Sequence, residues 1–142
     1  MKKDYGIAIE LILWTKEPSV DINKIVSLIG LEPFEIESIG DTIEYGRENK
    51  HTRIAQVSSV IYRTNKIKTE EVESAIDSFM NQIKPKKDVI VKTVKENNLN
   101  ARVCVWIDLE NKPLISLPKP FVKYASDLES DIEFDMYISG SD

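Results

Sequence analysis

A chain of 142 residues is long enough for one hydrophobic core, and its formal net charge of -5 argues against a general nucleic-acid-binding surface. Hydrophobic residues make up 42% and charged residues 30% of it, which excludes a disordered or fibrous chain. No run approaches the roughly 20 apolar residues of a membrane helix, and Asp4 and Glu10 interrupt the apolar N-terminal stretch, which argues against a signal peptide. We therefore expect one cytoplasmic domain, residues 1–142, with no nucleic-acid or membrane partner.

The first half of the chain predicts a strand, a helix and two more strands. Apolar residues alternate from Tyr5 to Leu13, and the odd positions are predicted to face the core. "DINKIVSLIG" has helical spacing, with Asp21 as N-cap and Gly30 as C-terminal stop. Strand patterns follow at 34–45 and 52–64, joined by the charged turn "YGRENKHTR". For the second of these strands the core face stays open between two sets: Ala55, Val57, Ser59 and Ile61, or Ile54, Val60 and Tyr62.

The second half predicts a long helix, a hairpin, a short helix and a final strand. The stretch "TEEVESAIDSFMNQIKP" has the apolar spacing of an amphipathic helix, with Thr69 as N-cap and Pro85 as its end or kink. A shorter helix over 86–98 is expected to end at Asn97 and Asn98. The strand pattern at 100–110 is predicted to pair through "NKP" with a strand at "LISLP". A helix follows Pro120, and a strand covers 131–138.

This order of elements predicts a single α+β domain. The expected architecture is a ferredoxin-like, split βαβ arrangement of about six mostly antiparallel strands, with three or four helices on one face. The other face of the sheet is then left open.

Several phrases of the sequence resemble a bacterial family of unknown function, the DUF4279 domain. They are "ELILW", "DINKIVSLIGLEP", the pair Gly40 and Asp41, "VSSVIYRT", a helix ending in "IKPKKD", and "DIEFDMYI". The resemblance covers nearly the whole chain and brings no catalytic residues. What it implies about function is a role in immunity to toxins, in which some members of the family are expected to act.

The sequence offers little for catalysis or for metal binding. The only histidine, His51, lies in a charged turn that supplies neither an orienting partner nor a dry pocket. Cys104 is expected on a strand, pointing away from the core, with Arg102 on its face. One histidine and one cysteine cannot supply the four ligands of a structural zinc site. We expect no catalytic residues, no metal and no cofactor.

The open sheet face is the candidate binding surface. Trp14, Trp106 and Tyr137 are expected there beside an acidic C-terminal stretch, which holds six carboxylates and no Lys or Arg from Asp127 to Asp142. Aromatic anchors flanked by charges are typical of protein interfaces. The predicted partner-binding residues are Trp14, Trp106, Tyr137, Asp131, Glu133 and Asp135.

These residues predict a non-enzymatic, acidic protein-binding domain whose partner is a basic protein. An immunity protein that blocks a basic toxin domain fits this description and the resemblance. One alternative is a small-molecule-binding domain or small enzyme, in which Arg102, Trp106 and Tyr137 hold an anion on the open face. Another is a homodimer joined across that face.

Overall fold

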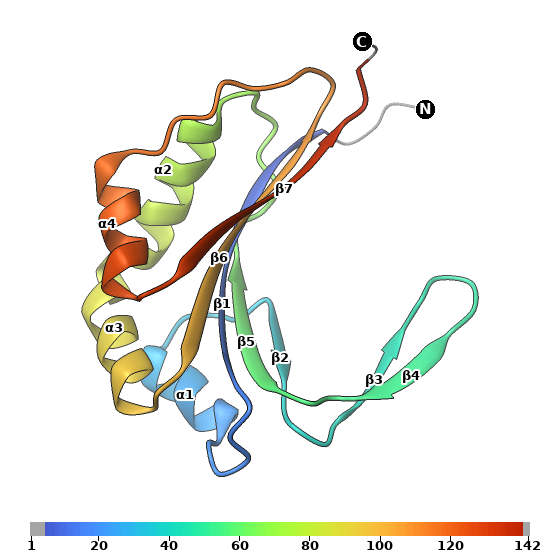
Figure 1. The fold of residues 1–142 in the computed structure, drawn as a ribbon, viewed down its shortest axis with the longest axis vertical. Helices are drawn as coiled ribbons and strands as arrows, with labels where there is room; N and C mark the ends of the chain where they lie inside the picture. Colours follow the sequence, from blue (N-terminus) through green and yellow to red (C-terminus); the bar gives the residue numbers. More distant parts are fainter. Residues whose placement is uncertain (1–4, 141–142) are drawn as a thin grey trace.

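The computed structural model describes residues 5–140, in which a mixed sheet is covered on one face by helices (Figure 1). The strands are β1 (Gly6–Thr15), β2 (Glu35–Glu37), β3 (Thr42–Tyr45), β4 (His51–Ile54), β5 (Ser58–Arg63), β6 (Asn100–Leu109) and β7 (Asp131–Ile138). The helices are α1 (Ile22–Ile29), α2 (Val72–Ile83), the 3-10 turn η1 (Lys84–Lys86), α3 (Lys87–Glu96) and α4 (Lys119–Asp127). No helix in the described range is long and apolar enough to cross a membrane.

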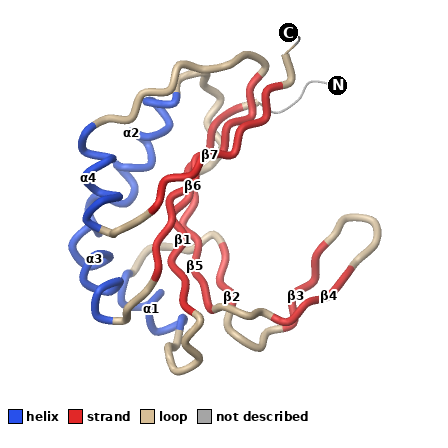
Figure 2. The backbone as a smooth tube through the Cα atoms, viewed as in Figure 1, coloured by secondary structure: helices blue, strands red, loops and turns tan. Residues whose placement is uncertain are grey.

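The large sheet has the strand order β2-β5-β1-β6-β7, and β3 pairs with β4 in a separate hairpin. β1 lies at the centre, antiparallel to both β5 and β6, while β7 runs parallel to β6 at one edge. The α+β class and the helices on one face are confirmed (Figure 2). Within the described residues, the large sheet has five strands where about six were expected, and it is mixed but mostly antiparallel, because only the β6–β7 pair is parallel. The ferredoxin-like connectivity stays a prediction.

The core lies between the helices and the odd-numbered side of β1. Ile7, Ile9, Leu11 and Leu13 are fully buried, as the alternating pattern predicts. The helices contribute the apolar faces that their spacing indicates, and Phe79 of α2 packs edge-on against Phe121 of α4. Burial of this continuous apolar layer is the main driving force for the fold.

The predicted helix ends are partly confirmed. The Asp21 carboxylate accepts a hydrogen bond from the N–H of Asn23, and Gly30 ends α1 with a left-handed φ of 74°. Pro85 lies in the 3-10 turn between α2 and α3. The prediction that Thr69 caps α2 is wrong, because the helix begins at Val72 and the Thr69 hydroxyl accepts from the N–H of Glu71 in the preceding turn.

The predicted hairpin between 100–110 and "LISLP" is also wrong. Residues 111–118 form no strand, and β7, which arrives after α4, is the outer neighbour of β6. Pro113 and Pro118 have no N–H to donate to a ladder, and Leu114 is 88% exposed, so the segment gains little from pairing.

The two strand patterns before α2 each divide into two strands. β2 and β5 join the large sheet, whereas β3 and β4 form the hairpin that projects beyond it (Figure 1). Val60 and Tyr62 therefore face the core, but Ile54 of the same predicted set lies on the hairpin and is 52% exposed. Of the two sets left open for 52–64, the one with Val60 and Tyr62 gives the core face of β5, although Ala55 of the other set is also buried, in the turn between β4 and β5.

Candidate functional site

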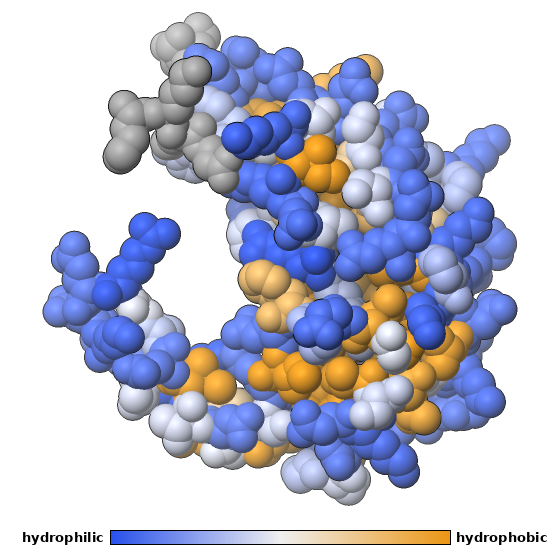
Figure 3. Space-filling view, turned by 180° about the vertical axis from the view of Figure 1, so that it is seen from behind, coloured by the Kyte–Doolittle hydropathy of each residue, from blue (hydrophilic) through white to orange (hydrophobic). Residues whose placement is uncertain are grey.

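The sheet face away from the helices and the projecting hairpin together form a concave surface. We call the hairpin, residues 42–54, the arm, and the whole surface the concave face. The space-filling view shows the molecule hollowed between the arm and the rest of the domain (Figure 3). The Arg53 guanidinium bonds the Glu37 carboxylate of β2 at 2.8 Å, which ties the base of the arm to the sheet.

The strand register places charged residues in one row across the concave face. Arg63 of β5 is opposite Glu10 of β1, Glu10 is opposite Cys104 of β6, and Cys104 is opposite Glu133 of β7. Trp106 and Asp135 are opposite one another two residues further along β6 and β7. Side chains two residues apart on one strand share a face, so all of these side chains lie on the side away from the helices.

Arg63 is held by three groups at once. Its Nε lies 3.7 Å from a carboxylate oxygen of Glu10, and its guanidinium lies 5.1 Å from the ring centre of Phe34 and 5.6 Å from that of Trp106. Glu10 is only 6% exposed, so its charge requires a close cation. A planar guanidinium can pair with a carboxylate and stack on aromatic rings at the same time. These contacts fix an aromatic and charged cluster at the centre of the concave face.

Carboxylates line the β7 side of the concave face. We call Asp131, Glu133 and Asp135 the acidic edge. Glu133 lies 3.4 Å from the Nε of Arg102, whereas Asp131 and Asp135 make no ion pair with another residue of the range 5–140. A hollow of about 310 Å³ lies between Trp106 and two residues of this edge, Glu133 and Asp135, and its lining includes Ile12 and Cys104. The β6–β7 side of the face therefore has more carboxylates than cations to pair with them.

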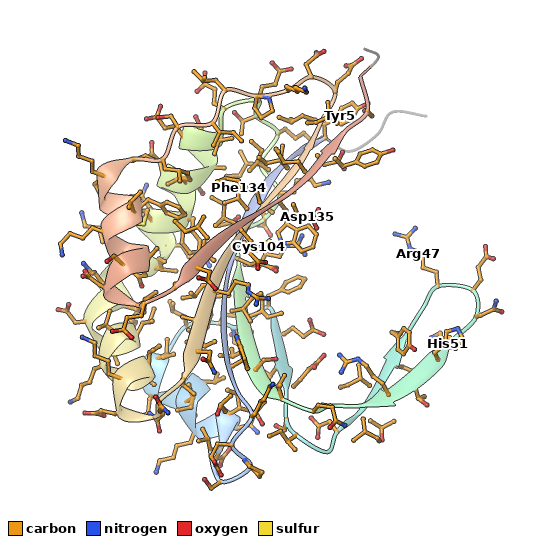
Figure 4. All side chains as sticks on the ribbon, viewed as in Figure 1. Tyr5, Arg47, His51, Cys104, Phe134 and Asp135 are labelled. Carbon is orange, nitrogen blue, oxygen red and sulfur yellow. The ribbon has the colours of Figure 1, made fainter. Side chains whose placement is uncertain are left out.

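Cys104 lies in this hollow as a buried thiol, on the face predicted for it (Figure 4). Its pKa is raised to about 11, mainly by burial and then by the carboxylates of Glu10, Asp135 and Glu133 in that order, while Arg102 acts in the opposite direction. The thiol is therefore protonated at neutral pH and is a poor nucleophile.

His51 lies far from this cluster, at the start of β4 on the arm (Figure 4). It is exposed, and its ring lies 5.4 Å from that of Tyr45, its partner across the hairpin. In the described part of the chain no group of three or more His, Cys, Asp or Glu side chains could hold a metal ion.

The structure brings together only some of the predicted binding residues. Trp106, Glu133 and Asp135 surround the same hollow. Ala8 of β1 is the register partner of Trp106, and Trp14 lies six residues further along β1. At the rise of a β-strand, the two tryptophans are therefore roughly 20 Å apart along the sheet. Trp14 and Asp131 line a second hollow beside the ends of α3 and α4, and Tyr137 is 57% exposed near the other end of β7.

Two residues of the central cluster were not predicted from the sequence. Phe34 precedes the short strand β2, and Arg63 ends β5, whose core face the pattern left open. Once Val60 and Tyr62 are assigned to the core, alternation places Arg63 on the open face. Phe34 is positioned beside β5 by its backbone N–H, which donates a hydrogen bond to the carbonyl of Ile61 at 2.7 Å. No local sequence signal predicts that bond.

The fold and this surface define an α+β domain whose open sheet face carries fixed aromatic groups and an excess of carboxylates. The chain belongs to the family described as "Domain of unknown function (DUF4279)", whose model matches residues 6–139. The resemblance seen in the sequence is thereby confirmed. Comparisons with curated proteins and with solved structures gave no match.

Proposed function

We propose that this protein is a non-enzymatic binding domain that captures a basic protein partner on its concave face. The observation that supports this most is the pairing pattern of the charges. Arg63 and Arg102 already pair with Glu10 and Glu133, whereas Asp131 and Asp135 have no ion-pair partner among the described residues. A cationic partner would satisfy these carboxylates, and it would meet Trp106 in a fixed orientation.

The shape of the concave face favours a macromolecular partner. The arm lies beyond the sheet and gives the face a second wall, so a bound segment would contact both (Figure 3). Excess carboxylates on a concave surface focus the electrostatic field and raise the association rate of a cationic protein by about 10- to 1000-fold. A basic toxin domain, the partner expected from the family resemblance, has this chemistry.

The charges disfavour the two alternative functions. An anion held by Arg102 would compete with Glu133, which already pairs with that guanidinium, and would lie close to Glu10 and Asp135. A homodimer joined across the concave face with its two-fold axis beside β7 would place two acidic edges near one another, at a cost in Coulomb energy. A basic partner meets neither obstacle.

A capture experiment with matched variants tests the proposal. The purified protein is used to pull down partners from the native cell extract, beside a variant with Asp131→Asn, Glu133→Gln and Asp135→Asn. The control variant carries Glu70→Gln, Glu73→Gln and Asp88→Asn, which remove three exposed charges from the helical layer. We expect a basic protein to be retained by the wild type and the control and to be lost from the acidic-edge variant. Equal retention by all three would contradict the proposal.

A further inference from the structure

We propose that the partner adds an extended strand to the free edge of β7, and that this strand alternates cationic and apolar side chains. This inference rests on the proposed function, which supplies the basic protein partner. The free edge of β7 indicates how that partner binds and which residue pattern its bound segment has.

The outer edge of β7 is available for pairing. Within residues 5–140, β7 pairs with β6 from Asp131 to Ile138 and with no other strand. The N–H and C=O groups on its outer side are therefore without a partner strand over an eight-residue length. Proteins usually protect such edges with Pro, charged side chains or short strands. β7 has no Pro, and its charged side chains are all carboxylates, which leave pairing with a cationic strand open. The opposite edge strand, β2, has only three residues.

The two faces of β7 specify different neighbours. Phe134 and Met136 point to the helix side and are 37% and 52% exposed, so apolar surface beside the core is still uncovered. Asp131, Glu133 and Asp135 point to the concave face. Side chains directly opposite one another on neighbouring strands lie about 4.5–5.5 Å apart. A strand beside β7 would therefore place apolar residues against Phe134 and Met136, and Lys or Arg against the acidic edge.

A second copy of the chain fits this edge poorly. Antiparallel pairing of two β7 strands centred on Phe134 would place Glu133 opposite Asp135 twice. Parallel pairing would place each carboxylate beside its own copy. Like charges directly opposite one another destabilise a strand pair. The acidic edge thus disfavours pairing between copies and favours a cationic strand.

Synthetic peptides test this inference directly. The probe is a capped heptapeptide of alternating Lys and Val that begins and ends with Lys. One control has the same composition with all Lys residues before the Val residues, and another has the alternating sequence with its three central amides N-methylated. Affinity is measured by calorimetry, and the binding site by amide chemical-shift changes.

We expect the alternating peptide to bind, with shifts along β6 and β7 and slower exchange of the β7 amides. Asp135→Lys, at an exposed position, should weaken this binding about tenfold or more. Both control peptides should bind more weakly. No binding by the alternating peptide, equal binding by all three peptides, or shifts confined to the arm would overturn the β7 inference. The two proposals can fail separately. The proposed function is supported if the acidic-edge variant loses the basic protein in the capture experiment, even when the peptide experiment overturns the β7 inference.

Discussion

Glu10 is a carboxylate on the central strand of the sheet, and its environment explains the arrangement of the concave face. With 6% of its surface exposed, it has lost most of its hydration, and Arg63 supplies the opposite charge. Arg63 is in turn positioned by Phe34 and Trp106. The exposed aromatic surface is therefore linked to a buried ion pair, and the cluster should be rigid before any partner binds.

Replacing Arg63 by Leu should destabilise the fold. The change leaves Glu10 buried without its cation and removes both ring contacts, at a cost of about 1–3 kcal/mol in the free energy of unfolding. Arg53→Leu is the control, because the Arg53–Glu37 pair is more exposed and its loss should cost less than about 1 kcal/mol. Urea denaturation measures both values. Equal losses in the two variants would contradict the role assigned to Arg63.

The Cys104 thiol should react slowly in the native protein. Its pKa is raised from 9.0 to about 11, so at pH 8 the thiolate fraction is about a hundredfold lower than in the unfolded chain. Iodoacetamide labelling at pH 8 should accelerate strongly in urea, and Asp135→Asn should accelerate native labelling by lowering the thiol pKa. Because the folded pKa is the higher one, this group stabilises the fold below about pH 9, and that contribution is lost as pH rises toward 11. Native labelling as fast as in urea would rule out this environment.

At the scale of elements, the arm is the part of the domain that adds least to the core. The side chains of β4 are all exposed, and an isolated two-stranded hairpin is only marginally stable. Its base is closed by backbone hydrogen bonds from the Ala55 N–H to the Asp41 carbonyl at 2.8 Å and from the Gly40 N–H to the Ala55 carbonyl at 3.0 Å. The arm is therefore a separable wall of the concave face.

Deleting the arm should leave the rest of the domain folded. A variant in which residues 42–54 are replaced by two glycines keeps Asp41 and Ala55 close enough to preserve the bonds at the base. We expect its free energy of unfolding to change by about 1 kcal/mol or less, since few buried apolar contacts are lost. Affinity for the captured partner should fall, because one wall of the concave face is gone. Chemical denaturation and calorimetry test the two parts, and a collapse in stability would show that the arm supports the core.

The elements that sequence reasoning predicted well are those with local signals. The first and last strands alternate, and α1 carries its own cap and stop residues in Asp21 and Gly30. "LISLP" alternates too, but no local feature indicates that β7, arriving after α4, takes the place beside β6. Thr69 was misassigned for a related reason, because a hydroxyl can accept a hydrogen bond in a turn as readily as at a helix start.

For the whole molecule, local sequence patterns predict only part of the candidate site. Trp106, Glu133 and Asp135 could be placed on the open face because alternation within each strand fixes their side. Trp14 shares that side, yet pattern alone does not give the distance along the sheet, and the structure places it by another hollow. Phe34 and Arg63 depend on how β2 and β5 join the sheet, which is decided by long-range pairing.

The association rate of the captured basic protein, measured by stopped flow from low to high salt, tests most directly whether the acidic concave face recognises its partner. We predict a rate for the wild type that falls steeply as salt screens the carboxylates. With Glu133→Lys and Asp135→Lys the rate should be about tenfold or more lower at low salt and nearly independent of salt. The control with Glu70→Gln, Glu73→Gln and Asp88→Asn should behave like the wild type. An unchanged rate and salt dependence in the charge-reversed variant would contradict the account.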